Sequence, residues 1–477
     1  MKEEKLKQYF KNMVVKKSNI QEIFAAMSIP SFIRDWFINR YSNESNEINV
    51  NFLKSKINEL MLKDVSFESV IDKIMSGQKV KFLAKINIHI DLRTSNVSFT
   101  LPDYPIDAKQ TLIPKYIWDK VKNDLLFSDG DNWGIITLGY QAVQEGKNTV
   151  NKVTLEDYRA FVPYNVDLTY FKEARSYFTT EEWINVVLEA IDYNSLGYDS
   201  EETKLMVITR LLPFVEKRLN LIELAPKGTG KSYLFSQISK YGWLSTGGVM
   251  TRAKLFYDMK LKQEGLIANY DYVALDEIST IKFPDENEIQ GALKGYMENG
   301  KYTVGVKASS ATSGVVILGN IDYENMNIEA PMFNTLPNIF KDSALVDRFH
   351  GFIEGWKMPR MRENLKMCGL ALNTEYFSTI MHNLRDDMEA SAIVDKYVGY
   401  NSDADTRDVV AVKRIATAYI KLLFPHWSLS KNNVNLEEFE QYCLNRAINM
   451  RGIIKKQLIM MDVEYSHSPQ AKFFIKN

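Results

Sequence analysis

The chain has 477 residues, of which 45% are apolar and 25% are charged, and its formal net charge is −1. This length allows two to four domains, and the balanced charge means that any basic surface for nucleic acid must be local. No apolar run approaches the roughly 18 residues of a membrane span, and the charged N-terminus lacks the apolar core of a signal peptide. The two cysteines argue against a disulfide scaffold. We therefore expect a cytoplasmic protein with no membrane partner.

The first 165 residues are expected to form a mixed α/β module. Helical spacing of apolar residues predicts helices over residues 30–42 and 51–63, and a further helix around Trp118. Residues 133–140 are apolar and predict a strand that follows a turn.

A change of period marks the middle of this module. Apolar and polar residues alternate over residues 79–93, which predicts one long half-buried strand. A second strand over residues 97–101 would pair with it as a hairpin. Residues 141–153 are polar and are expected to be rich in turns.

One face of the predicted long strand is basic and carries Lys79, Lys81, Lys85 and Arg93. Such a face fits a contact with a phosphate backbone, and it is equally typical of a solvated strand face. The residues alone leave both interpretations open.

The segment NLIELAPKGTGKS, residues 220–232, has the form of a strand, a small-residue turn and the start of a helix. Backbone N–H groups must close around a polyphosphate, and glycine permits the tight backbone that this requires. The predicted phosphate cradle consists of Pro226, Lys227, Gly228, Thr229 and Gly230. Lys231 would bind the β and γ phosphates of ATP, and Ser232 would bind Mg²⁺. Ala225 stands where the full motif has its first glycine, and it fits if the backbone keeps a negative φ there.

Two further apolar strands are expected to end beside this loop. The strand over residues 271–275 is followed by Asp276, a predicted Mg²⁺ ligand, and by Glu277, which would orient the attacking water. The strand over residues 315–319 is followed by Asn320, which would hydrogen-bond the water and the γ-phosphate. Together with the loop, these residues predict an ATPase that uses ATP and Mg²⁺.

Two arginines complete the predicted catalytic set. Arg348 follows a short apolar helical segment, from which it could reach the γ-phosphate bound by a neighbouring subunit. Arg407 lies near the start of an amphipathic helix and could swing toward the nucleotide from a lid. Because Arg348 has no evident role in its own subunit, it points to a homo-oligomer.

This series of motifs resembles AAA+ ATPases, and in detail it resembles the Lon-like BrxL family of BREX phage-defence systems. The segments that carry the second resemblance include FTTEEWINVVLEAI, YDYVALDEIS, VVILGNI, ALVDRFHGFIEGWKMPRM and TRDVVAVKRIA, and in the N-terminal module PSFIRDWFINRY and WGIITLGY. The resemblance implies an α/β core with a parallel sheet, a helical lid and a hexameric ring or a stacked pair of rings. It also implies DNA and other BREX proteins as partners.

The segment YMENGKYTV, residues 296–304, resembles the MCM-type helicases. That likeness implies a hairpin facing a central pore, with Lys301 and Lys307 as DNA-facing residues. Members of the BrxL family typically continue into a Lon-like C-terminal domain, and this chain resembles a short form without it. No protease activity is therefore expected from it.

The expected organisation has four parts. They are an N-terminal module over residues 1–165 that includes a possible DNA-binding surface, an AAA+ core over 166–358, a helical lid over 359–430 and a helical tail over 431–477.

The leading hypothesis is an ATP-hydrolysing ring that binds or moves along DNA in phage defence. One alternative is a protein unfoldase that works with a separate peptidase, for which Tyr296 or Phe283 would be the pore aromatic. The other alternative is a scaffold that uses ATP only to assemble.

Overall fold

The computed structural model describes residues 2–17, 24, 29–41, 49–62, 65–91, 94–126, 130–145, 148–260, 262–430, 434–467 and 471–476. The chain forms two compact units. Unit 1 consists of Met1–Asn19, Pro30–Asp35 and Val166–Asn477, and unit 2 consists of Ile20–Ile29 and Trp36–Asn165.

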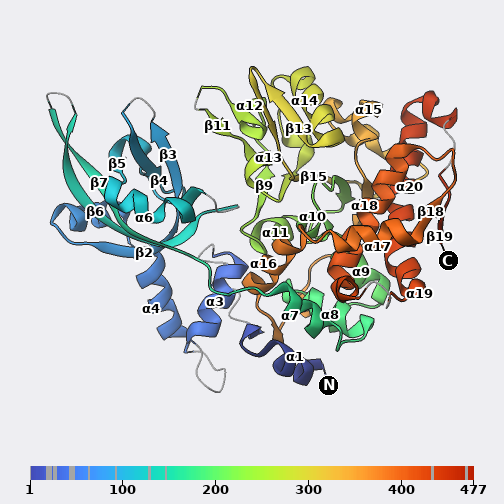
Figure 1. Cartoon of the computed structure of the whole chain (residues 1–477), viewed down its shortest axis with the longest axis horizontal. Coiled ribbons are helices and arrows are strands. Elements are labelled where there is room, and N and C mark those ends of the chain that lie inside the picture. Colours follow the sequence, from blue (N-terminus) through green and yellow to red (C-terminus); the bar gives the residue numbers. More distant parts are fainter. Residues whose placement is uncertain are drawn as a thin grey trace. The chain divides into compact units, whose positions relative to one another are not determined.

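The centre of unit 1 is a five-stranded parallel sheet with the strand order β16-β8-β15-β12-β9. Two of these strands, β9 and β15, are labelled in Figure 1. The strands are β8 (Leu221–Ala225), β9 (Gly242–Thr246), β12 (Tyr272–Asp276), β15 (Gly314–Asn320) and β16 (Gly351–Glu354). All residues of β8 and β12 are buried, as expected for a parallel sheet that is covered on both faces. The α/β class with a parallel sheet is therefore confirmed.

Helices cover both faces of this sheet. The helices of unit 1 are α1 (Lys2–Phe10), α7 (Leu168–Arg175), α8 (Thr180–Ala190), α9 (Glu201–Thr209), α10 (Leu212–Val215), α11 (Lys231–Gln237), α12 (Arg252–Leu255), α13 (Leu266–Asn269), α14 (Glu286–Asn299), α15 (Ser343–Val346), α16 (Thr374–Leu384), α17 (Glu389–Tyr397), α18 (Thr406–Leu423), α19 (Leu436–Phe439) and α20 (Asn445–Met461). On one face, α14 and α20 share a core with alternate residues of β8, β12 and β15. On the other, the ring of Tyr272 packs against Phe214 of α10 and Phe235 of α11.

Short antiparallel pairs surround the sheet of unit 1. They are β1 (Val14–Lys17) with β17 (Gly369–Leu372), β10 (Tyr257–Asp258) with β11 (Gln263–Glu264), β13 (Lys301–Val304) with β14 (Lys307–Ser310), and β18 (Val398–Tyr400) with β19 (Phe473–Ile475). The first pair joins residues more than 350 positions apart, which explains why the N-terminal segment groups with unit 1 rather than with the N-terminal module. The expected helical tail over residues 431–477 is not purely helical, because it includes β19. Its helix α20 packs in the core on one face of the sheet.

Unit 2 has its own sheet and core. Its elements are α4 (Val50–Met61), α5 (Phe67–Met75), α6 (Lys115–Leu126), β2 (Val80–Lys85), β3 (Asn87–Asp91), β4 (Asn96–Thr100), β5 (Thr111–Leu112), β6 (Trp133–Glu145) and β7 (Asn148–Ala160), while α3 (Ser31–Tyr41) runs from unit 1 into unit 2. Four strands form a sheet in the order β2-β6-β7-β5, and β3 pairs with β4 as the predicted hairpin. The apolar faces of α5 and α6 pack on this sheet.

Two sequence predictions in unit 2 are wrong. The single long strand is interrupted at the fully buried Ile86, whose N–H donates to the carbonyl of Asn132 at 3.0 Å, and β2 and β3 pair with different partners. Residues 141–153 are not mainly turns, because β6 and β7 stay paired to Glu145 and Asn148. The polar side chains there do not prevent pairing, since the backbone ladder supplies the hydrogen bonds.

A buried histidine fastens the start of the central strand β8. The N–H of Asn220 donates to Nδ1 of His350 at 3.0 Å, and the N–H of His350 donates to the carbonyl of Asn220 at 2.8 Å. Burial, with smaller contributions from Arg414 and Arg451, lowers the pKa of His350 well below its usual value. The folded protein therefore holds this imidazole neutral.

We expect His350 to make the protein less stable in mild acid. A histidine whose pKa is lower when folded contributes fully above its unfolded pKa of about 6.5, and this contribution falls as the pH drops below that value. The His350→Gln variant, which keeps an acceptor but does not titrate, should lose less stability between pH 7 and pH 5 than the wild type. Urea unfolding at both pH values measures this, and equal losses would contradict it.

Candidate active site

The predicted phosphate loop lies between the end of β8 and the start of α11. Ala225 is the last residue of β8 and is extended, which is compatible with an alanine at this position. Gly228 and Gly230 have φ values of 83° and 80°, in the left-handed region that favours glycine. A Cβ atom on Gly230 would lie 2.7 Å from the hydroxyl of Tyr193. Both the conformation and the space therefore require glycine at position 230.

Most of the predicted nucleotide-binding residues line one cavity of about 500 Å³. The lining residues are Lys227, Gly228, Thr229, Gly230, Lys231, Ser232, Tyr233, Asp276, Glu277, Asn320 and Met361. They converge because β8, β15 and β12 are neighbours in the sheet and their carboxyl ends meet at one edge. Pro226 does not line the cavity with its side chain, but its carbonyl lies 3.5 Å from Nζ of Lys231.

Direct contacts join the predicted catalytic groups. Nζ of Lys231 donates to Oδ1 of Asn320 at 3.2 Å and to the carbonyl of Ala225 at 3.3 Å. The hydroxyl of Ser232 donates to Oδ2 of Asp276. Burial lowers the pKa of the Lys231 ammonium, while the nearby carboxylates of Glu223, Asp276 and Glu277 act in the opposite direction.

The two adjacent acids occupy different environments. Asp276 is buried and contacts Ser232, whereas Glu277 is exposed. Glu277 has a φ of 49°, which is uncommon for a residue other than glycine, and it lines the cavity. The buried Asp276 suits a role in binding Mg²⁺, and the exposed Glu277 suits a role in orienting water.

The oxygen atoms of Ser232 and Asp276 are suitable ligands for Mg²⁺. This ion prefers oxygen ligands and is commonly held by one or two carboxylates together with the phosphates of the substrate. Within the described ranges, no group of three or more His, Cys, Asp or Glu side chains could hold a metal on its own. The donor set therefore fits an ion that arrives with a nucleotide.

Neither of the two predicted arginines lines this cavity in its own chain. Nε of Arg348 lies 3.0 Å from Oε2 of Glu298, and Arg407 lies 3.4 Å from the same carboxylate. Arg407 also donates to Oδ2 of Asp347 at 2.7 Å, and Arg451 holds the other oxygen of that acid at 2.5 Å. Burial favours the neutral acid, but Arg451 and Arg407 together lower the pKa of Asp347. Arg348 and Arg407 thus share Glu298 rather than facing the phosphate loop.

Sequence reasoning missed the groups that support the phosphate loop. Arg210 and Glu223 form a fully buried ion pair, and Arg210 also donates to the carbonyl of Thr229 at 2.8 Å. The N–H of Met361 donates to the carbonyl of Gly228 at 2.8 Å. The one available signal was the charged residue Glu223 within the otherwise apolar strand LIELA, since such a residue needs a buried partner.

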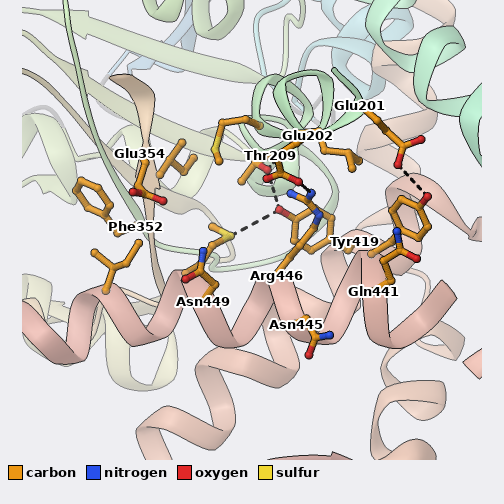
Figure 2. A pocket seen from close by; sticks show the side chains of 16 residues that line it. Glu201, Glu202, Thr209, Phe352, Glu354, Tyr419, Gln441, Asn445, Arg446 and Asn449 are labelled. Atoms are coloured by element: carbon orange, nitrogen blue, oxygen red, sulfur yellow. Dashed lines mark hydrogen bonds and ion pairs between the residues drawn. The ribbon is translucent and has the colours of Figure 1, made fainter. Parts of the chain in front are cut away.

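A second cavity, of about 270 Å³, lies among α9, β16, α18 and α20 and contains no predicted site residue (Figure 2). Its polar groups contact one another: Thr209 and Tyr419 lie 2.7 Å apart, Tyr442 donates to Glu201 at 2.9 Å, and Arg446 pairs with Glu202 (Figure 2). These three contacts pair six of the polar side chains that line the cavity with one another.

The predicted DNA-facing residues lie in two places. In unit 2, Lys79 and Lys85 form ion pairs with Glu156 at 3.2 Å and Asp131 at 2.8 Å, Lys81 is exposed, and Arg93 lies outside the described residues.

In unit 1, β13 and β14 form a hairpin with an exposed Lys301 and with Val306 96% exposed at its turn. Lys307, on the second strand, lies 3.1 Å from Glu264.

Comparison with known families identifies the chain. Residues 153–470 match the family described as "Lon-like protease BrxL-like, ATPase domain", and residues 8–140 match "BREX system Lon protease-like protein BrxL N-terminal". The chain belongs to the BrxL family. The match of the ATPase domain covers the sheet, the phosphate loop and the helices that follow, so the expected family and its P-loop core are confirmed.

Members of the BrxL family from two bacteria resemble the chain over most of its length. It is 28% identical over 459 residues to "Lon-like protease BrxL" of Escherichia coli O9:H4 (strain HS), which covers 95% of the chain and 64% of that protein. It is 28% identical over 475 residues to "Lon-like protease BrxL" of Bacillus cereus (strain H3081.97), with 97% and 68% covered. The chain thus spans about two thirds of the length of these relatives.

A viral protein is similar over a shorter region. "Uncharacterized protein ORF426" of Acidianus filamentous virus 1 is 27% identical over 212 residues, which is 40% of the chain and 48% of that protein.

None of the helices in the described part of the chain combines the length and the apolar character needed to cross a bilayer.

Proposed function

We propose that the chain hydrolyses ATP, assembles into a hexameric ring or a stacked pair of such rings, and binds or moves along DNA in BREX-type phage defence. The observation that carries this proposal is the convergence of Lys231, Ser232, Asp276 and Asn320 on one cavity at the end of the parallel sheet. Membership of the BrxL family supports it. Other BREX proteins are the expected partners within the cell.

The side chains around the cavity suit γ-phosphate transfer to water. The loop N–H groups and Lys231 would bind the phosphates, and Asn320, which lies 3.2 Å from the Lys231 ammonium, would contact the γ-phosphate. The exposed Glu277 orients the attacking water and accepts its proton. Ser232 and Asp276 would hold Mg²⁺, which supplies positive charge to the phosphates.

The position of Arg348 and Arg407 supports assembly into a ring. Arg348 and Arg407 lie together at Glu298 and not at the cavity of their own chain, so an arginine that joins Lys231 at the γ-phosphate would come from another copy. A head-to-tail contact of this kind forms a closed ring when the rotation from each copy to the next adds up to a full turn. Each cavity would then be completed by its neighbour.

The relatives are named "Lon-like protease", but the groups around this cavity favour phosphate chemistry. An unfoldase would need an exposed aromatic side chain to grip its substrate. The two aromatic candidates, Tyr296 and Phe283, are buried at 0% and 7% exposure and belong to the core of unit 1. Neither residue can therefore serve as an exposed pore aromatic.

The β13–β14 hairpin is the proposed DNA contact in unit 1. The double variant Lys301→Ala/Lys307→Ala should bind DNA about tenfold more weakly and show a shallower dependence of affinity on salt, because each lost phosphate contact lowers that slope by nearly one. Fluorescence anisotropy with labelled duplex and single-stranded DNA, between 50 and 200 mM salt, measures both effects.

A matched control for this experiment is Lys456→Ala on α20. Lys456 is 46% exposed and pairs with the exposed Glu329, so its loss removes a surface charge that does not belong to the hairpin. The control should bind DNA like the wild type. Equal binding by all three proteins would exclude the hairpin, and no DNA binding by the wild type would favour an unfoldase.

A further inference from the structure

The phosphate loop is held by bonds to its carbonyl groups. The carbonyl of Thr229 accepts from Nη1 of Arg210 at 2.8 Å, and the carbonyl of Gly230 accepts from the N–H of Leu234 at 3.2 Å in the first turn of α11. The C=O and the following N–H of a trans peptide point in opposite directions. The N–H of Gly230 therefore points away from Arg210, and Gly230 itself lines the cavity.

Arg210 reaches the loop from within the protein. Its guanidinium is fully buried and donates from Nε and Nη2 to the two oxygens of Glu223, at 2.9 and 2.5 Å. Nη2 also lies 3.3 Å from the hydroxyl of Thr229. A planar guanidinium can serve both partners at once because its donors are fixed in a fork, which a lysine ammonium cannot reproduce.

Glu223 is fixed in turn by its place in the sheet. It lies in the middle of β8, between the parallel strands β15 and β16, and is fully buried. A Cβ atom on Gly355 would lie 2.7 Å from Oε1 of Glu223, so the glycine there leaves room for the acid. A buried ion pair often stabilises a fold no better than apolar residues of the same size. Here it offers something that apolar residues cannot, namely a donor aimed at the phosphate loop.

We propose that Arg210 is a positioning residue that holds the phosphate loop ready for a nucleotide before binding, with Glu223 fixing Arg210 in place. This inference rests on the proposed function, because it assumes that the cavity binds ATP. If the loop adopts its binding conformation only part of the time, the apparent affinity for nucleotide is multiplied by the fraction of time spent in that conformation. Once a nucleotide is bound, it holds the loop in that conformation. Loss of Arg210 therefore acts on affinity more than on the chemical step.

The test is the Arg210→Lys variant of the full chain. It keeps the charge beside Glu223 but loses the fork, and the loss of bonds from a charged donor predicts KM for ATP and Kd for ADP raised by about tenfold or more. The value of kcat at saturating ATP should stay within about threefold of the wild type. Steady-state phosphate release and calorimetric titration with ADP measure the two effects.

Glu223→Gln serves as a second variant that keeps the shape of the side chain. It should also raise KM for ATP. Arg446→Lys is the matched control, because Arg446 pairs with Glu202 in the second cavity, whose lining includes no residue of the phosphate loop (Figure 2). It should leave KM unchanged even if it lowers the thermal stability.

Unchanged KM and Kd in Arg210→Lys, or a loss confined to kcat, would overturn the proposal. If Arg210→Lys does not fold, the same outcomes in Glu223→Gln decide it. A wild-type protein that binds no ATP at all would instead refute the proposed function, so the two failures are distinguishable.

Discussion

Replacement of Glu277 by Gln is expected to lower ATP turnover by about 10²–10⁴-fold while leaving nucleotide affinity near that of the wild type. Glu277 is the exposed acid of the cavity, and the amide that replaces it cannot accept a proton from water. Asp276, which contacts Ser232, stays intact, so the predicted Mg²⁺ ligands are unaffected. Phosphate release and ADP titration on the same preparation separate the two properties.

The control for this substitution is Glu329→Gln, which changes an exposed acid that pairs with Lys456 far from the loop in sequence. It should leave turnover unchanged. If Glu277→Gln turns over ATP as fast as the wild type, Glu277 does not orient the water. If the wild type shows negligible turnover but still forms nucleotide-dependent oligomers, the protein is a scaffold.

Replacement of Arg348 by Ala is expected to lower ATP turnover by about 10³-fold, the size of effect seen when an arginine that neutralises the transferred phosphate is lost. In a single chain this arginine pairs with Glu298 and does not line the cavity. Its effect would therefore come from a neighbouring copy. Turnover measured above and below the concentration at which the oligomer forms checks this result.

Arg252→Ala is a matched control, because Arg252 is an arginine of unit 1 that forms an ion pair with the partly exposed Glu288 at 2.9 Å. It should retain turnover. If both arginines leave Glu298 for the nucleotide, the separate variant Arg407→Ala should also reduce turnover. An active enzyme that stays monomeric with ATP would contradict the role of Arg348.

The phosphate loop and its acids could be predicted because local sequence determines them. A strand, a glycine turn and a helix are specified by a short segment, and a residue that follows a buried parallel strand must lie at the carboxyl edge of the sheet. Asp276, Asn320 and Lys231 therefore come together as soon as the sheet forms.

Other features depend on partners that no local pattern names. The contact of Arg210 with Glu223 and Thr229 arises only when β8 and the end of α9 pack together. The interruption at Ile86 also has no local signal. Apolar and polar residues continue to alternate through it, although β2 pairs with β6 and β3 pairs with β4. The location of Arg407 at Asp347 likewise follows from the packing of α18 and not from the helix itself.

The most direct test of a cavity completed by a second copy mixes two inactive variants. Lys231→Ala lacks the lysine of the cavity but keeps Arg348, and Arg348→Ala keeps the cavity but lacks the arginine. Mixed at equal concentrations and allowed to exchange subunits, they should regain roughly a quarter of the wild-type turnover, since random mixing around a closed ring places one intact cavity in four beside an intact arginine. Turnover no higher than the sum of the two separate variants would contradict the account.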